Sequence, residues 1–175
     1  GDLSISTLQY TYGMFFNYKI MENYGYSGQD LYNMVFDGKW TVDWADFEEK
    51  LKQADLFLLC SPHNPMGRGW SEEELCRMGD ICLKHNVLVV SDEIHFDIIM
   101  PGHKHVSYPT LGEKYANNCV MCCAASKTFS LAGLCVANAI IPNPELRDKL
   151  NNEVNISGCY TYSIFGLRAL EAGYM

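Results

Sequence analysis

The sequence has few basic residues: 13 Lys and Arg against 21 Asp and Glu give a formal net charge of −8. A protein that binds nucleic acid needs clustered cations to displace the counterions of the phosphate backbone, so this balance argues against that class. No apolar run approaches the roughly 20 residues that a membrane span requires. No basic segment followed by an apolar one indicates a signal peptide. These absences predict a protein without a membrane partner, which we expect in the cytoplasm.

The composition is that of a globular protein, with 48% hydrophobic and 19% charged residues in a chain of 175. Most of the eight cysteines lie inside apolar segments, where cysteine usually behaves as a small buried hydrophobe with a reduced thiol. Cys119 and Cys122 have the spacing of a redox or metal pair. Because no second pair or histidine cluster completes a metal site, a strand explains the spacing better.

Four short apolar runs predict buried strands, at residues 56–60, 87–90, 120–123 and 136–141. Helical patterns lie before, between and after them, at residues 43–51, from 71 onward and at 145–154. The second of these helices begins with a capping box, in which Ser71 and Glu74 each satisfy a backbone N–H of the other. Apolar strands that alternate with helices predict an α/β fold, a mostly parallel sheet with helices on both faces.

Three of the predicted strands are followed by loops rich in polar residues: 61–70, 91–97 and 124–129. In open α/β sheets, sites form where such loops meet beyond the carboxyl ends of the strands. Each loop could be a plain turn on its own. Together, and in this order, they predict one shared crevice.

The three loops resemble motifs of fold type I enzymes that use pyridoxal 5'-phosphate (PLP), the aspartate aminotransferase superfamily with its class I/II aminotransferases. Within it, they are most similar to the cystathionine β-lyase (C–S lyase) subgroup of the MalY/PatB type. The motifs are Ser-Pro-His-Asn-Pro-Met-Gly-Arg at 61–68, Ser-Asp-Glu-Ile-His at 91–95 and Ser-Lys-Thr-Phe at 126–129. The resemblance extends over essentially the whole chain and implies a PLP-binding large domain.

The resemblance implies a role for one residue in each motif. Lys127 would form the Schiff base with PLP and then move the proton at the substrate α-carbon. Asp92 would hold the pyridine nitrogen in its protonated form, and Asn64 would donate a hydrogen bond to the phenolic O3′. Each has a structural alternative. Lys127 could be a surface lysine, Asp92 could cap a helix or point to solvent, and Asn64 could be a turn residue before Pro65.

Three further residues are weaker candidates for cofactor binding. His95 stands where aminotransferases often have a tyrosine near O3′, and histidine there is typical of the lyase subgroup; a core histidine is the alternative. Tyr12 matches the aromatic residue that stacks on the pyridine ring, with Tyr10 as a competitor. Ser126 could contact the phosphate. Arg68 could face the substrate, but a structural role in its loop is the first interpretation.

The sequence departs from the common aminotransferase pattern at two positions. Ala124 stands where those enzymes carry a serine, and Cys135 stands where they often carry an arginine. The phosphate must then be held mainly by a glycine-containing loop that the family carries upstream. We expect residues 1–175 to be the central part of the large domain, without the N-terminal segment, the phosphate-binding loop and the C-terminal small domain. Such a piece should be weakly active or inactive.

The function that the resemblance implies first is β-elimination from a sulfur-containing amino acid such as cystathionine or cysteine, which gives a thiol, pyruvate and ammonia. The second is transfer of an amino group to a 2-oxo acid, by the same lysine, aspartate and asparagine. A third reading, from another class, is a regulatory protein that retains a PLP fold. Full-length members of the family are homodimers, and we expect no metal.

Overall fold

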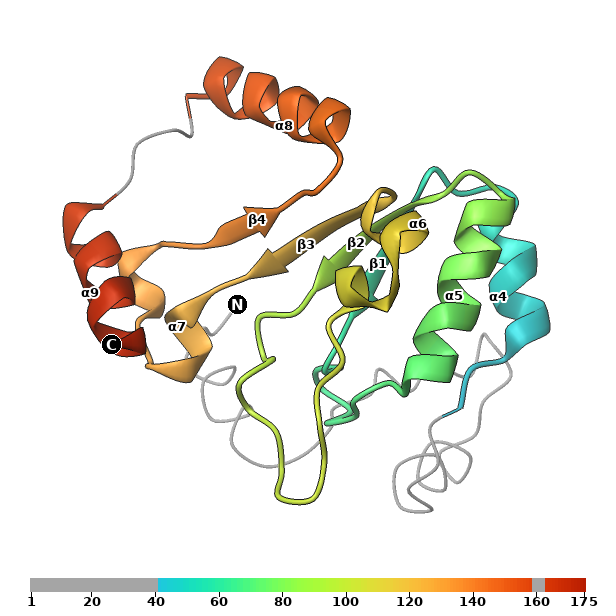
Figure 1. Cartoon of the computed structure of the whole chain (residues 1–175), viewed down its shortest axis with the longest axis horizontal. Helices are drawn as coiled ribbons and strands as arrows, with labels where there is room; N and C mark the ends of the chain where they lie inside the picture. The colour runs from blue at the N-terminus through green and yellow to red at the C-terminus, as the bar shows by residue number, and fades with distance from the viewer. Residues whose placement is uncertain (1–40, 159–162) are drawn as a thin grey trace, which may run out of the picture. The chain divides into compact units, whose positions relative to one another are not determined.

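Four strands form one sheet in the computed structural model, which describes residues 41–158 and 163–175 (Figure 1). The strands are β1 (Leu56–Cys60), β2 (Leu88–Asp92), β3 (Cys119–Cys123) and β4 (Asn138–Ile140). Their order in the sheet is β1-β2-β3-β4, with β1, β2 and β3 parallel and β4 antiparallel to β3. Residues Asp43–Met175 form one compact unit, within which all contacts below lie.

The fourth predicted strand differs from the others in direction and length. Only a four-residue helix, α7 (Ala125–Thr128), and a short 3-10 turn, η2 (Ala132–Leu134), separate β3 from β4. A parallel strand needs a crossover, usually through a full helix, and this connection contains none. The chain therefore turns back on itself beside β3 (Figure 1). The predicted α/β fold with a mostly parallel sheet is confirmed, and β4 is its antiparallel member.

The longer helices begin at side chains that cap them. They are α4 (Trp44–Leu51), α5 (Glu72–Lys84), α8 (Pro144–Ile156) and α9 (Ile164–Tyr174), capped by Asp43, Ser71, Asn143 and Ser163. The predicted capping box is present: Glu74 N–H donates to Ser71 Oγ at 3.2 Å, and Ser71 N–H donates to the Glu74 carboxylate at 3.0 Å. The predicted helices at 43–51, after 71 and at 145–154 are confirmed within a few residues.

The core lies between one face of the sheet and helix α5. Strand side chains on this face include Leu59, Val89 and Cys119, and α5 contributes Leu75, Met78 and Cys82, all at most 2% exposed. The short elements η1 (Tyr108–Leu111) and α6 (Glu113–Ala116) extend this layer. On the opposite face the sheet is open at Leu58, which is 70% exposed. Among the described residues, the prediction of helical cover therefore holds for one face.

Cys119 and Cys122 lie in strand β3, as predicted from their apolar surroundings. Side chains three residues apart on a strand point to opposite faces, so these two thiols cannot bind one ion together. Every cysteine in the described part of the chain is free. None of the helices in residues 41–158 and 163–175 is long and apolar enough to cross a membrane.

Candidate functional site

Asp92 is the last residue of β2 and lies between two cysteines in the sheet. It pairs in register with Cys60 at the end of β1 and with Cys122 near the end of β3. Paired residues of neighbouring strands share a face, so Asp92 lies on the same face as the exposed Leu58, two residues before Cys60. A half-buried carboxylate thus lies at the carboxyl end of an inner strand, on the open face of the sheet.

Among the described residues, the two oxygens of the Asp92 carboxylate differ in their hydrogen bonds. The Ile94 N–H donates to Oδ1 at 3.2 Å, and within residues 41–158 and 163–175 no hydrogen bond to Oδ2 is recorded. The main chain around Asp92 is fixed on both sides: Ser61 N–H donates to the Asp92 carbonyl at 2.9 Å, and Glu93 N–H donates to the Cys122 carbonyl at 2.8 Å. The main chain of Asp92 is thus fixed by hydrogen bonds to both neighbouring strands. Among the described residues, Oδ2 of its side chain has no hydrogen-bond donor.

Asn64 lies in a tight turn that begins at the end of β1. His63 N–H donates to the Arg68 carbonyl at 2.7 Å, and Gly67 N–H donates back to the His63 carbonyl at 2.8 Å. Gly67 has a φ of +64°, which a residue without Cβ adopts at little cost. The Asn64 N–H lies 3.4 Å from Cys60 Sγ, and the side chain is exposed. Asn64 is therefore exposed, four residues after Cys60, which is the β1 residue that pairs with Asp92.

Arg68 holds this loop to helix α5, as the structural interpretation predicted. Its guanidinium forms an ion pair with Glu74, a member of the capping box. It also lies over the Trp70 ring, 4.5 Å from the centroid, and the Trp70 indole N–H donates to the Cys60 carbonyl at 2.9 Å. The Asn64 turn is thus fixed to both the strand and the helix.

Lys127 lies in the single turn of α7, four residues after the end of β3, and its side chain is exposed. The preceding Ser126 is half-buried and lines a cavity of about 10 Å³ with residues of η2 and α9, a space too small for a phosphate group. A phosphate contact by Ser126 would therefore have to form on another side of the residue, and its role stays a prediction.

His95 lies three residues beyond Asp92, in the turn that follows β2, and is half-buried. Its carbonyl accepts from the Ile98 N–H at 2.9 Å, which closes that turn. Tyr12 and its competitor Tyr10 lie outside the described residues. The Cys135 position, where the common pattern has arginine, is exposed and left-handed with a φ of +52°.

The structure adds a buried carboxylate that the sequence patterns did not single out. Glu93 is 0% exposed. Its Oε1 accepts from Ser91 Oγ at 2.8 Å and from the Tyr108 N–H at 2.9 Å, and its Oε2 lies 2.8 Å from His105 Nε2. Burial raises the pKa of Glu93, but hydrogen bonds, that of His105 foremost, outweigh it and hold the pKa below its ordinary value. Glu93 is therefore ionised and fastens the segment after β2 to the core.

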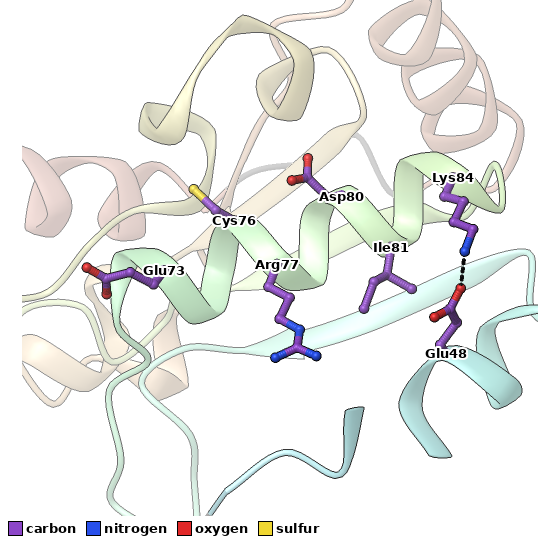
Figure 2. Close-up of a pocket in the computed structure, with 7 residues that line it drawn as sticks. All are labelled: Glu48, Glu73, Cys76, Arg77, Asp80, Ile81 and Lys84. Atoms are coloured by element: carbon purple, nitrogen blue, oxygen red, sulfur yellow. Dashed lines mark hydrogen bonds and ion pairs between the residues drawn. The ribbon is translucent and has the colours of Figure 1, made fainter. Parts of the chain in front are cut away.

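One cavity lies away from this region, on the outer side of α5 facing α4 (Figure 2). It has a volume of about 370 Å³ and is lined mainly by charged side chains such as Glu48, Arg77 and Lys84. Lys84 and Glu48 are paired at 2.5 Å. Of the described residues predicted to bind a cofactor, none lines it, so this surface groove differs from the predicted site.

The predicted convergence of three loops agrees with the sheet order. The loops that carry Asn64, Asp92 with His95, and Lys127 follow the carboxyl ends of three adjacent parallel strands, and such ends lie at one edge of a sheet. The arrangement offers an amine, a carboxylate, an amide and an imidazole at that edge. Amine, carboxylate and imidazole groups are the side chains that commonly transfer protons in enzymes.

Comparison with known proteins gives consistent matches. The family described as aminotransferase class I and II matches residues 14–174. The chain is 44% identical over 140 residues to cystathionine beta-lyase PatB of Bacillus subtilis, covering 79% of this chain and 36% of that protein. Cystalysin of Treponema denticola, solved with PLP, matches with a TM-score of 0.74 and 38% identity over 77% of this chain and 35% of cystalysin. A PLP-bound C–S lyase of Staphylococcus hominis matches with a TM-score of 0.71 and 33% identity, covering 78% and 34%. The chain thus spans about a third of the length of these relatives.

Proposed function

Because the chain belongs to the class I and II aminotransferase family, we propose that its protein is a PLP-dependent carbon–sulfur β-lyase. The substrate would be a sulfur-containing amino acid such as cystathionine, and the products a thiol, pyruvate and ammonia. One observation carries the proposal: Asn64, Asp92 and Lys127 follow the ends of three adjacent parallel strands in a chain with 44% identity to a cystathionine beta-lyase.

The chemistry of the Asp92 carboxylate suits PLP. When bound, PLP supplies an electron sink for the carbanion that forms at the substrate α-carbon. A half-buried carboxylate with one oxygen open to a partner suits the protonated pyridine nitrogen, because a cation offsets the cost of keeping the carboxylate out of water. Asp92 would thus hold the ring nitrogen, and Asn64 and His95 would lie toward the phenolic oxygen.

Lys127 would supply the reacting amine. Its Nζ would hold the cofactor at the aldehyde carbon and would accept the proton from the substrate α-carbon. Loss of the thiolate from the β-carbon would follow. Ser126 would contact the phosphate, and Tyr12 would stack on the ring.

An aminotransferase is the second candidate, and the breadth of the matching family favours keeping it. It would use the same lysine, aspartate and asparagine, and would differ in the fate of the carbanion. His95 in place of the tyrosine that aminotransferases often carry supports the lyase.

The test uses the protein expressed from its complete reading frame with PLP. We expect pyruvate from cystathionine without any 2-oxo acid, and a borohydride-reduced PLP label on the peptide that contains Lys127. Lys127→Ala should lose both, whereas Lys149→Ala, at an exposed position on α8, should keep both. Amino transfer that depends on a 2-oxo acid, with no pyruvate in its absence, would make the protein an aminotransferase. Absence of both activities and of the label would leave the regulatory reading.

Three broader features complete the proposal. Residues 1–175 would be the central part of a PLP-binding large domain, because the matched region covers 36% of the Bacillus relative. The complete protein would be a cytoplasmic homodimer. Size measurement by light scattering on the complete protein checks the dimer.

A further inference from the structure

Asp97 links three parts of the chain that are distant in sequence. It follows Asp92 by five residues and His95 by two. Its Oδ2 accepts a hydrogen bond from Thr128 Oγ1 at 2.9 Å and another from the Tyr174 hydroxyl at 2.8 Å. Thr128 is the residue directly after Lys127. One carboxylate oxygen thus connects the segment after β2, the turn that carries Lys127 and the last residue of α9.

The turn that carries Lys127 is short. Helix α7 has four residues, and no side chain caps its N-terminus. Two backbone hydrogen bonds close it: the Phe129 N–H donates to the Ala125 carbonyl and the Leu131 N–H donates to the Ser126 carbonyl, each at 3.0 Å. These bonds are local, whereas the hydrogen bond from Thr128 to Asp97 reaches another segment. Asp97 therefore ties this turn to the segment after β2.

Helix α9 lies beside α7 (Figure 1). The Tyr174 ring packs edge-on against Phe129, the C-cap of α7, with centroids 5.0 Å apart. Gly173 permits this approach, because a Cβ there would lie 2.7 Å from the Phe129 ring. Tyr174 is 53% exposed, and its partial burial and the hydrogen bond to Asp97 raise the pKa of its hydroxyl above the ordinary value. A phenol is protonated at neutral pH, so this hydroxyl donates.

We propose that Asp97 is a positioning residue, which fixes the turn carrying Lys127 against the segment carrying Asp92 and His95. The inference rests on the proposed function. In that function Lys127 and Asp92 contact opposite ends of one rigid ring, so their separation has to be constant. A misplacement near 1 Å can cost about 100-fold in rate, and two hydrogen bonds to one carboxylate oxygen restrict such a shift.

The experiment compares variants of the complete protein loaded with PLP. Asp97→Ala removes the acceptor and Thr128→Val removes the donor, whereas Asp97→Asn and Thr128→Ser keep an oxygen in each place. Tyr174→Phe keeps the ring contact with Phe129 and loses the hydroxyl. Asp148→Ala, on the exposed side of α8, is the matched control. The measurements are kcat and KM for β-elimination, and the rate at which borohydride fixes PLP to Lys127.

We expect Asp97→Ala and Thr128→Val to lower kcat by about 10- to 100-fold, with a smaller change in KM, and to slow the labelling of Lys127. Asp97→Asn, Thr128→Ser and the control should stay within a few-fold of the unmodified protein. Normal kcat and normal labelling of Lys127 in Thr128→Val would overturn the inference. This result decides the matter even where Asp97→Ala does not fold. Absence of any PLP label on Lys127 in the unmodified protein would overturn the proposed function and this inference together.

Discussion

Replacing Glu93 by alanine should destabilise the fold far more than replacing it by glutamine. The carboxylate is fully buried and receives Ser91 Oγ and the Tyr108 N–H on one oxygen and His105 on the other. Glu93→Ala leaves the Ser91 hydroxyl and the Tyr108 N–H without an acceptor and opens a cavity between them. Glu93→Gln keeps the shape and the first oxygen.

The contacts set the size of both effects. Each buried donor left unpaired costs about 1 to 3 kcal/mol, so the Ser91 hydroxyl and the Tyr108 N–H together account for about 2 to 6 kcal/mol. We therefore expect Glu93→Ala to lose about 3 to 5 kcal/mol of unfolding free energy. Glu93→Gln exchanges the bond to His105 for a neutral one and should lose about 1 to 2 kcal/mol. Since domains are stable by about 5 to 15 kcal/mol, the alanine variant should be marginal.

Urea unfolding of the complete protein at pH 7, followed by far-UV circular dichroism, measures these losses from the shift of the midpoint. Glu153→Ala, at an exposed position on α8, serves as the control and should not shift the midpoint. Equal losses for alanine and glutamine would mean that the hydrogen bonds of the first oxygen contribute nothing. A loss below about 1 kcal/mol for alanine would refute the reasoning altogether, because the buried donors would have found other acceptors.

Three further predictions concern stability. The difference in unfolding free energy between the unmodified protein and Glu93→Gln should stay constant from pH 7 to about pH 5 and shrink as the pH falls below the ordinary value of 4.5 toward the lowered pKa of Glu93, because the carboxylate ceases to stabilise the fold once it is protonated; urea titrations at several pH values check it. Ser71→Ala should cost about 1 kcal/mol in such a titration, through loss of the cap on α5, and Ser71→Thr should cost less. Gly79→Ala should lower the thermal midpoint, since its Cβ would lie 2.6 Å from the Tyr108 hydroxyl and the Tyr115 ring.

Local patterns in the sequence predicted much of this fold. The apolar run at 56–60 coincides with β1, and the Ser71 and Glu74 spacing forms the capping box. These features depend on residues at most four positions apart, so local spacing contains the information. The parallel order of β1 and β2 also followed, because helix α5 separates them, and β2 and β3 are parallel across a connection with only the short η1 and α6. The direction of β4 did not follow, since an apolar run has the same appearance in either direction.

The candidate site was predictable only in part for the same reason. The motifs around Asn64, Asp92 and Lys127 stand out because each follows an apolar strand. The partners of these motifs are remote: His105 lies 12 residues from Glu93, and Tyr174 lies 77 residues from Asp97. No periodicity joins such positions. A glutamate next to a buried strand end was the available signal, because a carboxylate there needs donors nearby.

Asp92 and Glu93 are neighbours in sequence that meet opposite environments, one open to a ligand and one enclosed by three donors. Since side chains alternate along a strand, a slip of β2 by one residue would exchange them. Asp92 would then enter the core with too short a side chain to reach the donors of Glu93, and Glu93 would lose all of them. The pair therefore favours one alignment of β2, because only the observed register gives both carboxylates their partners.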